Sequence, residues 1–124
     1  MRTRRLAVAT ILGIIWACSL PLPAAQAHAV ILESAPAQGS SGPAPRRLML
    51  RFNSRLERAL CSVQLLGPHQ RSIALLRPEP DTPPDTLAYP LPPLGAGAYQ
   101  ARWKVMAADG HVTEGTVAFT VAGS

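Results

Sequence analysis

The sequence predicts an all-β domain, a sandwich of seven or so short antiparallel strands joined by Greek-key connections. Two observations support this fold class. Short runs of alternating apolar and polar residues recur without a convincing long helix, and turn-forming residues, among 13 prolines and 9 glycines, separate these runs. The alternation is clearest in residues 99–105 and 117–121, which predict a hairpin around the loop Asp109-Gly110-His111.

The first 27 residues are typical of a secretory signal peptide. They have a basic start, an apolar run over residues 6–20 and an A-x-A cleavage site that ends at Ala27. Cleavage there leaves His28 as the first residue of a single small domain, residues 28–124. A transmembrane anchor is the alternative, but the apolar run is shorter than the roughly 20 residues that span a bilayer. We therefore expect an exported protein that is soluble after cleavage, by a route that the sequence does not decide.

The charge balance argues against a nucleic-acid partner. The whole chain has a formal net charge of +5, but residues 28–124 contain nine basic against seven acidic side chains. Their arginines are scattered, and no basic cluster is interleaved with aromatic residues. We expect no nucleic-acid binding.

Cleavage also removes Cys18 and leaves Cys61 as a single cysteine, so no disulfide can form within the domain. Cys61 begins an apolar stretch, and we interpret it as a small buried hydrophobe in preference to a metal ligand or a reactive thiol. Cys18 has an alternative role as the lipidated residue of a lipoprotein, although the residues before it match poorly. In that case His28 would lie inside the chain.

The other strands follow in order along the chain, each bounded by turn residues. Alternation or β-branched content predicts strands at residues 28–34, 48–52, 63–65, 72–76 and 86–89. Residues 56–60 form a segment too short to decide between a helical turn and a loop. The proline-rich segment 77–84 predicts an irregular connection, because proline cannot pair within a central strand.

Three further side chains each have an ordinary interpretation. Tyr99 follows Gly97-Ala98, which is typical of a tyrosine corner, in which the phenol binds a nearby backbone group; an ordinary half-buried tyrosine fits equally well. Trp103 lies on the apolar face of its run and is interpreted as a core residue. His69 lies in a Gly-Pro turn and is interpreted as a solvated loop residue.

Asp109 and His111 form half of a plausible metal site, and His28 is the candidate for the other half. A free N-terminal amine and the imidazole of the same residue chelate a metal in one ring, and a second imidazole and a carboxylate complete a nitrogen and oxygen set. Such a set suits Cu(II) or Ni(II), with Cu(II) favoured by the Irving–Williams order, whereas Zn(II) prefers a tetrahedral arrangement. Each residue alone also has an ordinary origin, in signal cleavage or in turn chemistry.

Several motifs together resemble the CopC-type periplasmic copper-binding proteins. They cover nearly the whole domain in the right order and are His28, residues 34–39 (SAPAQG), 50–52 (LRF), 89–94 (YPLPPL), 97–99 (GAY), 102–103 (RW) and 109–111 (DGH). The resemblance implies a seven-stranded cupredoxin-like or immunoglobulin-like sandwich. It also implies that one Cu(II) ion binds through His28, Asp109 and His111.

The resemblance extends to the branch of the family and to a partner. Some members add a Glu shortly after the second-strand Phe; the corresponding residue here is Ser54, with Glu57 three positions further on, so a fourth protein ligand stays open. One branch carries a Met-rich loop for Cu(I), which this chain lacks, so the resemblance is to the Cu(II)-only branch. The implied partner is a CopD-type protein of the inner membrane.

Three functions compete. We expect a non-enzymatic copper carrier or buffer that acts in copper homeostasis, resistance or delivery. A copper oxygenase resembling polysaccharide monooxygenases also uses a terminal histidine, but this domain is small for such an enzyme, and ligation by Asp109 would stabilise Cu(II) against reduction. A metal-free interaction sandwich is the third possibility and predicts no saturable copper binding.

Overall fold

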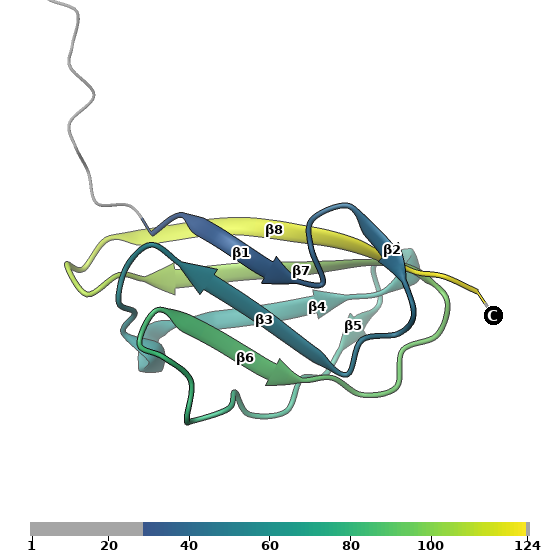
Figure 1. Cartoon of the computed structure of the whole chain (residues 1–124), viewed down its shortest axis with the longest axis horizontal. Helices are drawn as coiled ribbons and strands as arrows, with labels where there is room; N and C mark the ends of the chain where they lie inside the picture. The colour runs from purple at the N-terminus through teal and green to yellow at the C-terminus, as the bar shows by residue number, and fades with distance from the viewer. Residues whose placement is uncertain (1–28, 124) are drawn as a thin grey trace, which may run out of the picture.

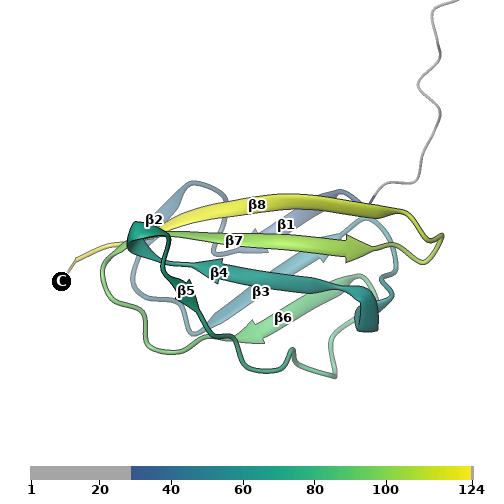
Figure 2. The same cartoon turned by 180° about the vertical axis from the view of Figure 1, so that it is seen from behind.

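Residues 29–123, the part of the chain that the computed structural model describes, form two β-sheets packed face to face (Figure 1). The expected signal peptide, residues 1–27, and His28 lie outside the described residues. The smaller sheet contains, in spatial order, β1 (Ile31–Ala35), β3 (Arg47–Phe52) and β6 (Thr86–Pro90). The larger sheet, nearer the viewer in Figure 2, contains in spatial order β2 (Ser40–Gly42), β8 (Val112–Val121), β7 (Gly97–Met106), β4 (Ser62–Leu66) and β5 (Ser72–Ile73).

The all-β sandwich predicted from the sequence is confirmed, with eight strands in residues 29–123 in place of the expected seven. The additional strand is β2, whose Ser-Ser-Gly sequence contains no apolar residue and therefore no strand pattern. It forms because it pairs in parallel with the end of β8, from Ser40 opposite Phe119 to Gly42 opposite Val121. The other strand pairs are antiparallel, and the chain crosses repeatedly between the sheets, as Greek-key connections do.

Several boundaries differ from the sequence-based expectation. β1 begins at Ile31, later than predicted, and β5 ends at Ile73, so that Leu76 lies in a loop with 68% of its surface exposed. The undecided segment contains a short 3-10 helix, η1 (Arg58–Leu60), and a second one, η2 (Pro68–Gln70), precedes β5. Across residues 29–123 we find no helix with the length and apolar character needed to cross a membrane.

The core lies between the two sheets, because alternate residues of each strand point inward. On β7 these are Tyr99, Ala101, Trp103 and Val105, all buried. Phe52, at the end of β3, packs edge-on against Trp103, with ring centroids 5.1 Å apart and an interplanar angle of 74°. Trp103 is therefore a core residue, as its place in the alternation predicts.

Tyr99 forms a tyrosine corner. Its hydroxyl donates a hydrogen bond of 2.7 Å to the carbonyl of Gly95, and its ring stacks on Phe119 with the centroids 5.5 Å apart. Because only 4% of the tyrosine is exposed, this bond satisfies a polar group that water does not reach. The bond ties the connection that precedes β7 to the first residues of that strand.

β7 and β8 build the long hairpin of the fold. Each strand has ten residues, and they pair along their full length without a bulge, from Gly97 opposite Val121 to Met106 opposite Val112. The connecting loop, residues 107–111, lies at the end of the sandwich where β1 begins (Figure 1). The last residues of β8 lie at the opposite end, so the hairpin spans the whole sandwich.

Gly115→Ala should destabilise the fold by about 1–3 kcal/mol, because a packed core accommodates an added methyl group only by moving its neighbours. Gly115 lies opposite Trp103 in the β7–β8 ladder, and a methyl group there would lie 2.2 Å from Cζ2 of the indole. Gly42→Ala is the control, since a Cβ atom at Gly42 meets nothing within 4 Å. Urea unfolding measures both variants, and equal stabilities would contradict this packing.

Candidate metal centre

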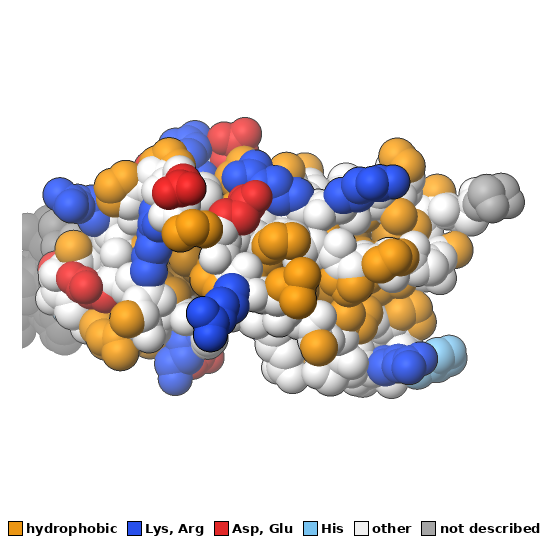
Figure 3. Space-filling view, turned by 90° about the horizontal axis from the view of Figure 1, so that it is seen from below, with side chains coloured by type: hydrophobic (Ala, Val, Ile, Leu, Met, Phe, Trp, Pro, Cys, Tyr) orange, Lys and Arg blue, Asp and Glu red, His pale blue; other side chains and the backbone are white. Residues whose placement is uncertain are grey.

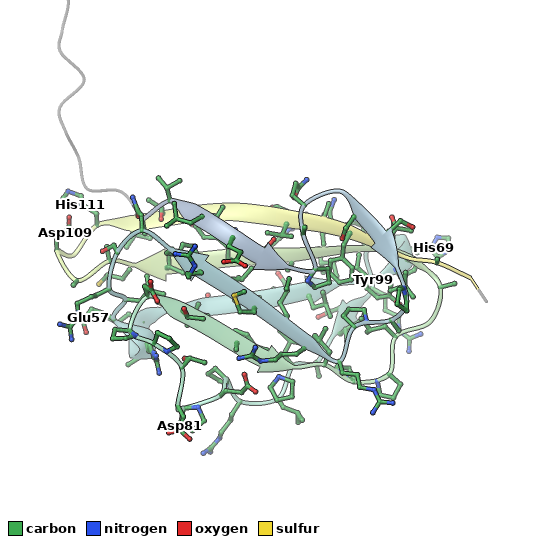
Figure 4. The ribbon with its side chains drawn as sticks, in the orientation of Figure 1. Glu57, His69, Asp81, Tyr99, Asp109 and His111 are labelled. Carbon is green, nitrogen blue, oxygen red and sulfur yellow. The ribbon has the colours of Figure 1, made fainter. Side chains whose placement is uncertain are left out.

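The loop between β7 and β8 is a closed turn held by its own backbone. The N–H of Ala107 donates to the carbonyl of His111, and the N–H of Gly110 donates to the carbonyl of Ala107, both at 2.9 Å. Gly110 has a φ of +90°, which a glycine adopts without steric cost. Asp109 and His111 flank this glycine and lie at the tip of the hairpin (Figure 4).

Asp109 and His111 contact each other directly. Nδ1 of His111 lies 3.0 Å from Oδ2 of Asp109, and the backbone N–H of His111 donates to Oδ1, also at 3.0 Å. The backbone N–H, followed by the ring, lowers the pKa of the Asp109 carboxyl below its ordinary value. Half of the imidazole surface and 38% of the carboxylate surface are exposed. The loop thus presents an imidazole and an ionised carboxylate, side by side, to the solvent.

A second segment supports the incoming arm of the loop. The N–H of Ala108 donates to the carbonyl of Arg55, and the N–H of Glu57 donates to the carbonyl of Met106, both at 2.9 Å. Between these bonds, Leu56 forms an isolated bridge with Ala107. Residues 55–57 therefore run antiparallel to the start of the loop and hold it in place.

Ser54 and Glu57, which the sequence left open as a fourth ligand, lie in or next to this segment. The hydroxyl of Ser54 donates to the carbonyl of Arg55 at 3.0 Å, one residue from the segment that holds the loop. Glu57 lies at the base of the loop, at the same end of the sandwich as Asp109 (Figure 4). In residues 29–123, no three His, Cys, Asp or Glu side chains are grouped to hold a metal ion, so Glu57 does not complete the pair into a site.

The start of the described chain is anchored beside the loop of residues 107–111, the candidate metal site, which we call the metal loop. The hydroxyl of Thr113, two residues after His111, donates to the carbonyl of Ala29 at 2.9 Å. Val30 exchanges two bonds with Asn53: its N–H donates to Oδ1 at 2.8 Å, and its carbonyl accepts from the Asn53 N–H at 3.0 Å. Ala29 is buried, with 2% of its surface exposed. The segment next to His28 in sequence is therefore tied to both sheets.

The sequence did not predict that the side chains of Asn53 and Thr113 bind the backbone at the start of the described chain. Asn53 follows β3 directly and interrupts its pattern, which is the local signal that a polar side chain there binds backbone. Thr113 has no such signal, because its partner is 84 positions away in the chain.

Of the three predicted ligands, the structure brings Asp109 and His111 together, and His28 lies outside the described residues. His69 is at the opposite end of the sandwich (Figure 4), away from this pair. Cys61 packs against the core, its thiol donates to the carbonyl of Glu57 at 3.3 Å, and burial is the main cause that raises its pKa. Cys61 is therefore a small hydrophobe at the margin of the core, only partly buried where the sequence predicted a buried residue.

The fold and the loop define a class of protein: a small β-sandwich with a histidine and carboxylate pair, of the types that metals bind, in a hairpin loop at one end. Residues 31–122 of this chain match the CopC domain. The chain therefore belongs to the CopC family of copper resistance proteins.

Individual relatives agree with this assignment. The chain is 31% identical over 104 residues to Copper resistance protein C of Pseudomonas syringae pv. tomato, covering 78% of this chain and 82% of that protein. It is 32% identical over 108 residues to Protein YobA of Escherichia coli, covering 83% and 86%. Among solved structures, PcoC, a methionine-rich copper resistance protein from Escherichia coli, superposes with a TM-score of 0.70 at 27% identity, covering 77% of this chain and 100% of PcoC. CopC from Methylosinus trichosporium OB3b superposes with a TM-score of 0.68 at 27% identity, covering 77% and 95%.

Family membership decides between the function classes that the sequence left open. CopC proteins bind copper and are not enzymes, so the expectation of a non-enzymatic protein is confirmed. The oxygenase and the metal-free sandwich are accordingly the weaker alternatives. CopC-family proteins are periplasmic, in agreement with the export expected from the first 27 residues.

In the metal-free protein, the Asp109 carboxyl should titrate with a pKa below its ordinary value of 3.8. His111→Ala should raise this pKa only part of the way, because the backbone N–H of residue 111, the larger cause, remains. Carbon-13 NMR of the Asp109 carboxyl group as a function of pH measures this pKa in the native protein and in the variant. Since the pKa is lowered in the folded state, the Asp109 carboxylate contributes to the stability of the fold above the ordinary pKa. This contribution is lost as the pH falls through the lowered value. A titration at or above the ordinary value would contradict the geometry.

Proposed function

We propose that this protein is a periplasmic carrier or buffer of Cu(II), active in copper homeostasis, resistance or delivery. One Cu(II) ion binds to the amine and imidazole of His28, after cleavage of residues 1–27, together with Asp109 and His111. The observation that carries this proposal is the Asp109–His111 pair, whose loop lies beside the anchored Ala29. Residues 28–124 then form the whole copper-binding domain.

The anchoring of Ala29 supports the contribution of His28. Consecutive Cα atoms are about 3.8 Å apart, so the residue before Ala29 begins within one residue length of an anchored position. That anchor is Thr113, which follows His111 by two residues. An amine and an imidazole that enter here need no long, flexible connection to meet the loop.

The donor set fits Cu(II) chemically. Two imidazoles, one amine and one carboxylate form a nitrogen and oxygen set, which favours Cu(II) over other divalent first-row metals in the Irving–Williams order. Because Nδ1 of His111 faces Asp109, we expect Nε2 to be the ring nitrogen that binds the metal. Asp109 then either binds the ion through an oxygen or orients the imidazole through the hydrogen bond. The amine and the imidazoles bind metal only when deprotonated, so affinity falls in acid.

We assign the protein to the Cu(II)-only branch of the family. A Cu(I) site requires several soft sulfur ligands. Residues 28–124 contain three sulfur-bearing side chains, Met49, Met106 and Cys61, and no methionine-rich loop. The Cys61 thiol lies 4.0 Å from the backbone carbonyl of Met106, and Met49 lies on β3 in the other sheet. The partner that we infer for copper exchange is an inner-membrane protein of the CopD type.

An added residue before His28 should weaken Cu(II) binding by about 100-fold or more, because it displaces the amine from its chelate ring with the imidazole. The measurement is a competitive Cu(II) titration, with EPR spectra, of the processed protein and of a form extended by one methionine. The processed form should bind one equivalent with nitrogen ligation. Equal affinities of the two forms would refute the N-terminal chelate.

His111→Ala should weaken Cu(II) binding by more than the 10- to 100-fold that is typical of a residue that only orients a ligand. Asp109→Ala should also weaken binding, and Asp109→Asn, which keeps an oxygen acceptor without the charge, separates ligation from orientation. His69→Ala is the matched control, since His69 lies at the other end of the sandwich. A loss in the control equal to that in His111→Ala would place the site elsewhere.

A further inference from the structure

The outer side of β8 is unpaired along the half of the strand that follows the metal loop. β8 pairs with β7 along its whole length, but on the other side only its last residues pair, with β2. The carbonyl of Ala118 faces that other side, where it accepts a 2.7 Å bond from the N–H of Gly39. Because alternate residues of a strand direct their backbone groups to the same side, those of Val112, Glu114 and Thr116 also point outward.

These three residues form what we call the open edge: the outward N–H and C=O groups of Val112, Glu114 and Thr116. Within the described part of the chain no backbone or side-chain group binds them on that side, and all three residues are exposed. The next outward N–H, of Ala118, is bound at 2.9 Å by the amide oxygen of Gln38. A side-chain amide thus occupies the place of a neighbouring strand's carbonyl, and beyond it no group of residues 29–123 takes that place.

A groove of about 570 Å³ lies between β8 and β1, on the same side of the sandwich. Its apolar lining comes from Ile31, Leu32 and Val117, and Leu32 is 55% exposed. In an added strand, alternate side chains would point toward this groove while the backbone bonds to the open edge. The groove and the edge together fit an extended chain with apolar residues at alternate positions.

The outer edge of β6, in the smaller sheet, is covered by contrast. Along the outer side of β6, the N–H of Glu79 donates to the carbonyl of Ala88 at 2.8 Å. The guanidinium of Arg58 holds the covering segment by donating to the carbonyls of Pro80, at 3.0 Å, and Thr82. Figure 3 views the molecule from this side, where charged side chains lie among hydrophobic ones. Proteins generally protect their sheet edges in this way.

We propose that the open edge binds an extended segment of the protein that exchanges copper with this one, by addition of a strand to the larger sheet. This inference rests on the proposed function. The segment bonds through its backbone to Val112, Glu114 and Thr116 and directs apolar side chains toward Leu32. Since Val112 directly follows His111, one end of the bound segment lies beside the metal loop. A ligand carried at that end can take the ion from the loop or deliver it.

A second copy of this chain fits the open edge less well. Two β8 strands that pair antiparallel and use all three residues place Val112 opposite Thr116 and Glu114 opposite Glu114. Like charges directly opposite each other destabilise a strand pair, and the ion pair of Glu114 with Lys104 at 3.7 Å offsets this only in part, because both side chains are largely exposed. A partner segment with a neutral or basic residue at the central position avoids this repulsion.

The test uses NMR of the nitrogen-15-labelled protein and a soluble acetylated peptide of alternating Val and Thr, with a terminal His and Lys. The amide signals of Val112, Glu114 and Thr116 should shift saturably and exchange more slowly with solvent. Thr116→Pro removes one outward N–H that the fold itself does not use and should weaken binding by at least about tenfold. Thr116→Ala keeps that N–H and should change the affinity by no more than about twofold. A backbone N-methylated peptide leaves the protein unaltered. It should bind the native protein as weakly as the unmethylated peptide binds the Thr116→Pro variant.

Three results would overturn the proposal. One is the absence of shifts at the open edge at millimolar peptide, and another is equal affinity of a folded Thr116→Pro variant. The third is a dimer that buries the same amides without peptide, which would assign the edge to a second copy. Cu(II) titration of the same samples separates the two proposals. Peptide binding without Cu(II) binding would refute the copper carrier, whereas Cu(II) binding without peptide binding would refute only the docking edge.

Discussion

The continuous pairing of β7 with β8 is the constraint on which the structure depends. Ten successive pairs without a bulge determine which side chains of both strands point inward, and they also bring Asp109 and His111 to the tip of the hairpin. A slip of one residue would turn Trp103 out of the core, since side chains alternate between the faces of a sheet. The same register therefore specifies the core and the metal loop, and a change that disturbs one disturbs the other.

The sequence predicted those parts of the structure that rest on local pattern. Alternation was sufficient for β3, β7 and the second half of β8, whereas residues 112–116 have no apolar alternation. The Gly-Ala-Tyr motif indicated a bond from the Tyr99 hydroxyl to backbone as one of two interpretations, and its partner is Gly95. β2 could not be predicted because it has no apolar residue and owes its conformation to the edge of β8. Within the site, close spacing indicated the Asp109–His111 pair. The anchor between Thr113 and Ala29 joins residues far apart in sequence, so only the fold reveals it.

The loop combines a hydrogen-bonded frame with two exposed side chains that we propose as ligands. Backbone bonds within the loop and from residues 55–57 hold its conformation, while the imidazole of His111 and the carboxylate of Asp109 stay open to solvent. For the copper carrier that we propose, this exposure is an advantage, because a competing ligand can approach without opening the fold. A buried site of the same composition would bind metal more persistently and exchange it more slowly. The open edge of β8 begins at this exposed loop, so access to the ion and contact with a partner share one region.

The two ends of the sandwich differ in what can be attached to them. Ala29 is buried and tied to Thr113, whereas Ala122 and Gly123 leave β8 at the far end as exposed residues. A fusion protein, affinity tag or surface tether joined after Gly123 therefore leaves the histidine and carboxylate facing the solution. An attachment before Ala29 would instead start beside the loop that holds them, so a surface-linked form of this protein is better joined through its carboxyl end.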